Sequence, residues 1–198
     1  MDIVLKSKIE ETINKAQKYC SQQYLEIVFV NTIPDTVLEV ISNRTQTLPA
    51  MYYANADMLK TRVKNGAYII KENDSIVGHI FAHRHEVHNH SVFERCSLWV
   101  HPKHRNNNLG LLLMDLLTEK YQKEFLISIA KEPSVHNNNE LLGMKHVSLS
   151  ELSQTLIATL EEIGKLRDEY DYKYYVNPYF ENKIKQFNKV LNGTKQNQ

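Results

Sequence analysis

Hydrophobic positions recur every three or four residues in several parts of the chain, and this spacing predicts amphipathic helices. Residues 6–23 place four apolar side chains on one face. The most regular pattern covers residues 109–124, where five leucines form one stripe and the charged residues face away from it. Weaker helical patterns cover residues 35–44, 57–64, 137–142 and 152–163.

Runs rich in β-branched and aromatic residues predict strands between these helices. The first run is 24–30, and two more, 67–71 and 76–87, flank the turn Asn73-Asp74-Ser75. A second turn, Asn89-His90-Ser91, precedes a run over 92–100. Together the runs from residue 67 to residue 100 predict a three-stranded antiparallel meander. Later candidate strands are 125–130, 146–149 and 170–176.

The order of these elements predicts the fold class. A strand, helix and strand of the length seen over 92–130 implies a parallel crossover. Helices before the meander and a crossover after it predict an α/β domain with a mixed, mostly antiparallel sheet. An additional N-terminal helix and a helical C-terminal segment beyond residue 150 extend this core. No internal repeat is visible, so residues 1–198 are interpreted as a single domain, with a disordered tail over 192–198.

Composition narrows the class of protein. The chain has 198 residues, of which 42% are hydrophobic and 24% are charged, as in globular proteins that bury a core. A formal charge of +1 provides no global field for nucleic acid or an anionic membrane, and no apolar run is long enough to span a bilayer. The N-terminus becomes charged within ten residues, unlike a secretory signal, and two cysteines cannot form a disulfide framework. We therefore expect a cytoplasmic protein.

One segment carries a recognisable chemistry. Residues 98–110 read as a strand end, a proline, a polar loop with Arg105, and Gly110 at the start of the leucine-rich helix. The first N–H groups of a helix have no internal partner and bind anions. Asn106, Asn107 and Asn108 tolerate positive φ, and a glycine lets the backbone approach a ligand closely. The loop is therefore predicted to cradle a pyrophosphate.

This segment resembles the signature of the GNAT superfamily of acyl-CoA-dependent N-acyltransferases. That signature is Val-x-Pro-x-x-Arg or Gln, two residues, Gly, one residue, then Gly or Ala. Here it reads Val100-His101-Pro102-Lys103-His104-Arg105-Asn106-Asn107-Asn108-Leu109-Gly110, with Asn108 at the position of the first glycine. The resemblance covers about residues 24–149 and includes Ile76-Val77-Gly78-His79 and Leu142-Gly143-Met144.

The resemblance implies acetyl-CoA as co-substrate and an amine as acceptor, a small molecule rather than a protein. It implies that main-chain groups of Leu98, Trp99 and Val100 meet the pantetheine arm. The residues implied to hold the pyrophosphate are Arg105, Asn106, Asn107, Asn108, Leu109 and Gly110. No membrane or nucleic-acid partner is expected. The oligomeric state stays open, with a dimer as one alternative.

The resemblance also implies a general base. Glu94 lies eleven residues before Arg105, where several family members keep a glutamate that accepts the proton of the attacking amine, directly or through water. Attack on a thioester needs a neutral amine, so a base near the thioester serves this chemistry. The alternative is a surface carboxylate in a cross-strand ion pair.

The general acid is left unassigned. Asn139 stands where many members have a tyrosine that protonates the leaving thiolate, and Glu132 replaces a common asparagine. Tyr172 and Tyr174 are weaker candidates. The departures at Asn108 and Asn139 favour a rival function, a non-catalytic acyl-CoA-binding or partner-binding domain.

Two further features have competing interpretations. His83 and His85 share one face of a predicted strand, which suits a metal site, a proton shuttle or an acceptor pocket. Carboxylates are few nearby and no Cys-x-x-Cys is present, so we predict no metal. Cys96 could act as a nucleophile, but a lone cysteine on a sheet is usually a small buried hydrophobe. We therefore predict direct attack in a ternary complex.

Overall fold

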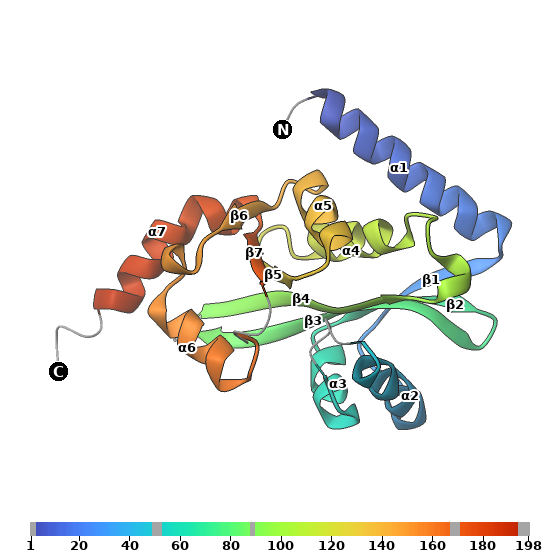
Figure 1. Cartoon of the computed structure of the whole chain (residues 1–198), viewed down its shortest axis with the longest axis horizontal. Coiled ribbons are helices and arrows are strands. Elements are labelled where there is room, and N and C mark those ends of the chain that lie inside the picture. Colours follow the sequence, from blue (N-terminus) through green and yellow to red (C-terminus); the bar gives the residue numbers. More distant parts are fainter. Residues whose placement is uncertain (1–2, 49–52, 88–89, 167–170, 194–198) are drawn as a thin grey trace. The chain divides into compact units, whose positions relative to one another are not determined.

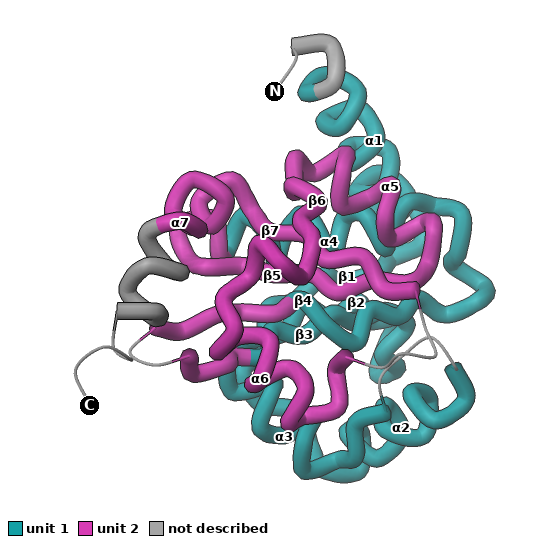
Figure 2. The backbone as a smooth tube through the Cα atoms, turned by 60° about the vertical axis from the view of Figure 1, so that its left-hand side comes forward, with its two compact units in different colours: residues 1–83, 95–120 teal, residues 84–94, 121–198 magenta. Residues whose placement is uncertain are grey.

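A computed structural model describes residues 3–48, 53–87, 90–166 and 171–193 of the chain, with side chains from residue 6 to residue 185 within those ranges. It divides into two compact units (Figure 2): unit 1 is residues 1–83 with 95–120, and unit 2 is residues 84–94 with 121–198. Two strands, β3 (Ser75–Val87) and β4 (His90–Val100), continue from one unit into the other.

Unit 1 consists of helices on two sides of a group of strands. Its helices are α1 (Ile3–Gln22), α2 (Asp35–Gln46), α3 (Ala56–Val63) and α4 (Leu109–Lys120). Its other strands are β1 (Leu25–Val30) and β2 (Ala67–Glu72), and a short 3-10 helix covers Pro102–His104. Figure 1 shows α4 on one side of the strands and α2 with α3 on the other.

The registers of unit 1 confirm the first half of the predicted meander. β1 pairs antiparallel with β2, opposing Leu25 to Glu72, and β2 pairs antiparallel with β3, opposing Ala67 to Phe81. The intervening turn contains Asn73 with φ 54, a left-handed conformation that asparagine tolerates. Predicted and observed bounds of these strands differ by one residue.

The helices of unit 1 bury apolar side chains. Leu38 and Ile41 of α2 and Leu59 of α3 are fully buried in one cluster with Phe81. The apolar face predicted for α1 is also buried, at Ile9, Ile13, Ala16 and Cys20. The helix periodicity therefore identified the inward faces correctly.

Unit 2 contains the remaining elements. Its strands are β5 (Phe125–Ala130), β6 (Lys145–Val147) and β7 (Lys173–Val176), and its helices are α5 (Pro133–Leu141), α6 (Gln154–Glu162) and α7 (Pro178–Gly193). A 3-10 turn covers Leu149–Glu151. β7 lies between β5 and β6 and pairs antiparallel with both, so Tyr175 faces Ser128 on one side and His146 on the other.

A second apolar cluster stabilises unit 2. It includes Leu156 and Leu160 of α6, Tyr174 and Val176 of β7, and Phe180 of α7, all at most 8% exposed. Successive strand residues point to opposite faces. Tyr174 therefore faces the α6 side, and Tyr175, whose ring lies 5.9 Å from that of His136 in α5, faces the other.

The strands are hydrogen-bonded in the order β1-β2-β3-β4-β5-β7-β6 and are mostly antiparallel, which confirms the predicted mixed α/β class. Across the described ranges, no helix combines the length and apolarity needed to cross a membrane.

Several predicted boundaries needed correction. β4 begins at His90, so the turn predicted at His90 and Ser91 is wrong, and α4 ends at Lys120 instead of residue 124. α5 begins at Pro133, four residues before the predicted start, because proline fits the first turn of a helix. The last strand begins at Lys173, and Tyr170, like Asn89 of the predicted turn, lies outside the described residues. α7 extends to Gly193, so the predicted disorder at residues 192 and 193 is wrong; residues 194–198 are not described.

Candidate active site

The loop before α4 has the backbone conformation that its asparagines predict. Asn106 has φ 65 and Asn108 has φ 58, both in the left-handed region. Between them, the side-chain amide of Asn107 donates to the carbonyls of His104 (3.3 Å) and Arg105 (3.0 Å). The triple asparagine therefore forms a fixed turn, held by its own hydrogen bonds.

The turn leads directly into α4, which begins at Leu109. The first bond from the helix to the loop runs from the N–H of Leu112 to the carbonyl of Asn108 (3.0 Å). The N–H groups of residues 109–111 precede that bond, and such groups have no acceptor inside a helix. Arg105 is exposed, and its Nε donates to the carbonyl of Val100 at 3.0 Å. A cation and a helix N-terminus thus lie at the same loop.

The space around Gly110 is open. A Cβ placed on Gly110 would meet no atom closer than Cδ2 of Leu98, at 3.9 Å, which is ordinary van der Waals contact. Packing within unit 1 therefore does not require glycine here. Close approach of a ligand such as a pyrophosphate gives the position a reason to lack a side chain.

Sequence reasoning missed the group that anchors this loop. His104 is fully buried, with Nδ1 3.1 Å from the hydroxyl of Tyr19 and Nε2 3.5 Å from a carboxylate oxygen of Glu72. The ammonium of Lys103 lies 2.7 Å from the other oxygen of Glu72. These contacts connect the loop to α1 and β2. The basic residues Lys103 and His104 are visible in the sequence, but their partners are distant in it.

The strand that leads into the loop is kinked at Ser97. Its φ of 53 is left-handed within β4, immediately before Leu98, Trp99 and Val100. The carbonyl of Ser97 accepts a hydrogen bond from Nδ1 of His79 at 2.7 Å, and its hydroxyl accepts one from Arg62 at 3.1 Å. A single left-handed residue re-aims a strand in the manner of a bulge.

Trp99 lies in a stack on this strand. The guanidinium of Arg44 lies 4.0 Å from its ring centroid, and the imidazole of His79 stacks with it at 5.6 Å and 19°. The pKa of His79 is lowered to about 3, mainly by burial; the bond to Ser97 opposes this shift and the nearby charge of Arg44 adds to it, so this imidazole is neutral at pH 7.

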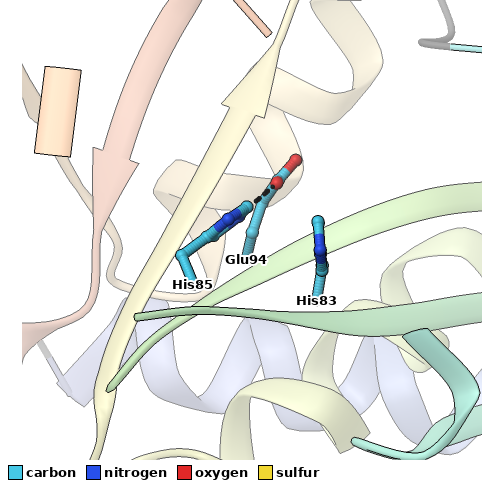
Figure 3. A group of neighbouring side chains, drawn as sticks. All are labelled: His83, His85 and Glu94. Carbon is cyan, nitrogen blue, oxygen red and sulfur yellow. Dashed lines mark hydrogen bonds and ion pairs between the residues drawn. The ribbon is translucent and has the colours of Figure 1, made fainter. Parts of the chain in front are cut away.

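Glu94 lies in unit 2 within a buried charged cluster (Figure 3). Its Oε2 accepts a hydrogen bond from Nε2 of His85 at 2.9 Å, and Nζ of Lys165 donates to its Oε1 at 2.8 Å. The side chains of Glu94 and Lys165 are 2% and 7% exposed. Burial alone would raise the pKa of the Glu94 carboxyl, but Lys165 and His85 outweigh it and hold the pKa below its ordinary value.

Comparison with known proteins decides the family. The model of the acetyltransferase (GNAT) family matches residues 38–141, more than half of the chain. The chain belongs to the GNAT acetyltransferase family. It is therefore an acyltransferase, and the resemblance seen in the signature segment is confirmed. No curated protein sequence matches the chain.

Solved structures of several enzymes share the fold of this chain at low sequence identity. N-acetylglutamate synthase from Neisseria gonorrhoeae, in complex with coenzyme A and N-acetyl-glutamate, aligns with TM-score 0.58 and 12% identity. That alignment covers 77% of this chain and 35% of the synthase. A Salmonella typhimurium protein described as an acetyltransferase, with its cofactor acetyl-CoA, aligns with TM-score 0.55 and 12% identity over 78% of this chain and 94% of its own. An acetyltransferase from Streptococcus agalactiae aligns with TM-score 0.54 and 19% identity, and the alignment covers 77% of this chain and 97% of that protein.

Metal binding is the alternative function of the residues around Glu94 in this GNAT acetyltransferase. His83, His85 and Glu94 offer three ligand atoms within 4.8 Å of one another, and all three come from β3 and β4 (Figure 3). Lys165 occupies one oxygen of the carboxylate, and His85 donates to the other. An ammonium in contact with the carboxylate supplies the positive charge that a cation would bring.

In this GNAT acetyltransferase, burial is shared by the weak acid candidates, the candidate nucleophile and the asparagine that replaces the usual tyrosine. Asn139 of α5 is fully buried, Tyr174 belongs to the apolar cluster of unit 2, and Tyr172 is half-buried against that cluster. Cys96 is buried in the apolar cluster of unit 1, and its thiol donates to the carbonyl of Phe81 at 3.6 Å. These surroundings are those of core residues.

Proposed function

We propose that the chain transfers an acetyl group from acetyl-CoA to the amine of a small molecule, by direct attack in a ternary complex. The observation that carries this proposal is the loop before α4. Asn106 and Asn108 with positive φ, the N-terminus of α4 and the open space at Gly110 together suit a pyrophosphate.

The proposed acetyl-CoA site follows the chain from β4 into α4. Main-chain groups of Leu98, Trp99 and Val100 meet the pantetheine arm, next to the kink at Ser97. The pyrophosphate is held by Arg105, Asn106, Asn107, Asn108, Leu109 and Gly110. All of these residues belong to unit 1.

Glu94, in unit 2, is the proposed catalytic base. The acceptor ammonium first loses one proton through His85 toward Glu94. The lone pair of the neutral amine then forms the new C–N bond, the C–S bond of the thioester breaks, and the nitrogen loses its second proton to solvent. The 2.9 Å hydrogen bond between His85 and Glu94 supports a proton path through this pair. A carboxylate kept ionised by Lys165 stabilises a positive charge on His85 while the proton is held there.

The leaving group needs no acid from the chain in this scheme. A thiol has a pKa of about 8.5, so a thiolate departs readily and takes its proton from water. Asn139 in place of the usual tyrosine is therefore compatible with turnover. We further propose that no metal takes part, and that the protein works in the cytoplasm, where its two cysteines, both buried and free, would stay reduced.

Binding and transfer are tested separately. Saturating acetyl-CoA should raise the melting temperature, and Arg105→Ala should reduce that shift, because ligand binding to the folded state stabilises it. Arg84→Ala is the matched control, since Arg84 is exposed and pairs with Glu86. A thiol-release assay over a panel of amines then identifies acceptors. No shift with acetyl-CoA or CoA would overturn the proposal, whereas binding without transfer to any amine would favour a non-catalytic acyl-CoA-binding domain.

A further inference from the structure

Arg44, near the end of α2, has no anionic partner among the residues that the structure describes. Its Nη1 is shielded from solvent and has no hydrogen-bond partner among the described residues. Its side chain is half-buried, and the ion pairs of the described ranges do not include it. Burial lowers the pKa of Arg44, and no carboxylate opposes that effect. A shielded guanidinium N–H that lacks an acceptor is costly, so the position has a reason beyond packing.

The guanidinium is also held in a fixed orientation. It lies 4.0 Å from the ring centroid of Trp99, and Trp99 is itself stacked with the neutral ring of His79. Cation–π contact through the face of the guanidinium restricts its plane and leaves the N–H groups at its edge able to donate within that plane. A planar fork of this kind matches the two oxygens of a carboxylate.

The phosphates of acetyl-CoA have their own proposed site elsewhere in unit 1. They are assigned to the loop at the start of α4, and Figure 1 shows α4 and α2 on opposite sides of the strands. Trp99 belongs to the strand segment whose main chain is proposed to meet the pantetheine arm. The ring of Trp99 contacts the guanidinium of Arg44, which belongs to α2. An anion bound by Arg44 is therefore a second anion, next to the reactive arm.

We propose that Arg44, oriented by Trp99, binds a carboxylate of the acceptor, so that the preferred acceptors are amines that carry a carboxylate, such as amino acids. This inference rests on the proposed acetyl transfer and names the substrate class of that reaction. Arg44 is then a specificity-determining residue. It contributes affinity for the acceptor and takes no part in the transfer of the acetyl group or the proton.

The test compares acceptors that differ only in the carboxylate. For each amino acid, kcat/KM is measured beside its carboxamide and its decarboxylated amine. The wild-type protein should prefer the carboxylate member by about tenfold to a hundredfold, the range expected for a charged hydrogen-bond pair. Arg44→Gln should remove that preference and leave the rates with carboxamides within about twofold. Arg44→Lys, which keeps the charge and loses the fork, should retain part of it.

Lys60→Gln is the matched control. Lys60 is an exposed cation of α3 that pairs with Asp35 at 2.8 Å, so the preference should survive its loss. A second readout is the melting temperature with each acceptor, which reports binding without turnover. The wild-type comparison also needs no variant to fold.

The outcomes separate this inference from the proposed function. If acetyl-CoA stabilises the protein and amines are acetylated without preference for a carboxylate, the role of Arg44 is wrong and acetyl transfer stands. If Arg44→Gln weakens the stabilisation by acetyl-CoA instead of the acceptor preference, its anion is a CoA phosphate and the inference is overturned. If acetyl-CoA neither binds nor reacts, the proposed function itself fails.

Discussion

The ammonium nitrogen of Lys165 lies 2.8 Å from Oε1 of Glu94, and both side chains are buried in unit 2. His85 occupies the second oxygen at 2.9 Å. Glu94 is therefore the centre of a buried charge network, in contrast to the surface ion pair that was the alternative to catalysis. Lys165 keeps the carboxylate ionised and would also weaken it as a base, so we expect changes in this network to affect both stability and rate.

Removing one member of this pair should destabilise the fold. Lys165→Met and Glu94→Gln should each lower the free energy of unfolding by about 3–5 kcal/mol, because each leaves a buried group without its partner. The double variant should cost less than the sum, since neither charge then remains. Urea unfolding at pH 7 measures all three. Strictly additive losses would show that the two groups are not coupled. The exposed pair Lys60 and Asp35 is the control and should show little coupling.

The same residues should affect the rate in different ways. Glu94→Gln should lower kcat by about a hundredfold or more at neutral pH while leaving the affinity for acetyl-CoA nearly unchanged. Raising the pH should partly restore the rate, because more of the acceptor amine is then neutral. Steady-state kinetics with an identified acceptor measure kcat, and titration with acetyl-CoA measures its affinity. An unchanged turnover across that pH range would refute the assignment of Glu94.

Lys165→Met provides an independent check on the base. Without the ammonium, the lowered pKa of Glu94 should return upward, because its main opposing charge is lost. The acidic limb of the kcat/KM profile should then move to higher pH in this variant. Lys183→Met is the control, since Lys183 is exposed and contacts the hydroxyl and ring of Tyr179, away from Glu94 in the sequence. A limb that stays in place would mean that Glu94 does not control the rate.

Local patterns in the sequence were sufficient for most of the fold. The stripe of leucines that predicted α4 is buried at Leu109, Leu112 and Leu117, and the conformations expected of the asparagine loop are observed at Asn106 and Asn108. These predictions succeed because helix periodicity and turn conformation depend on neighbouring residues. The predicted ends of strands and helices were less accurate. Pro133, for example, starts α5 one turn before the predicted residue.

The partners of the charged residues could not be predicted. Lys165 is 71 residues from Glu94, and Tyr19 is 85 residues from His104. No periodicity connects such pairs, because they meet only after the sheet has formed. Arg44 shows the same limit: its sequence position marks the end of a helix, whereas its stacking on Trp99 depends on the packing of α2 against β4. Local sequence was therefore least informative for charged side chains whose partners lie far away in the chain.

Acid should destabilise unit 1 through His79. Burial holds the pKa of His79 at about 3 when folded, against about 6.5 when unfolded, so only the unfolded state gains a proton as the pH falls below 6.5. Stability is full above that pH, and each unit of further acidification should cost up to about 1.4 kcal/mol until the folded-state pKa is reached. His79→Gln should be less stable at pH 7.5 and lose less between pH 6.5 and 5, as measured by urea unfolding. Equal slopes would contradict this.

Gly110 allows ligand binding to be separated from folding. A methyl group fits the protein at Gly110, 3.9 Å from Leu98, so Gly110→Ala should keep stability or raise it by up to about 1 kcal/mol, as alanine does in a helix. The same methyl would crowd a pyrophosphate, and an overpacked contact costs about 1–3 kcal/mol, or roughly fivefold to a hundredfold in the Kd for acetyl-CoA. Gly78→Ala is the converse control, because its methyl would lie 3.2 Å from Ile70 and should destabilise the fold. Unfolding curves and calorimetric titration of the two variants measure both quantities. Unchanged acetyl-CoA affinity in a folded Gly110→Ala protein would place the pyrophosphate away from this loop.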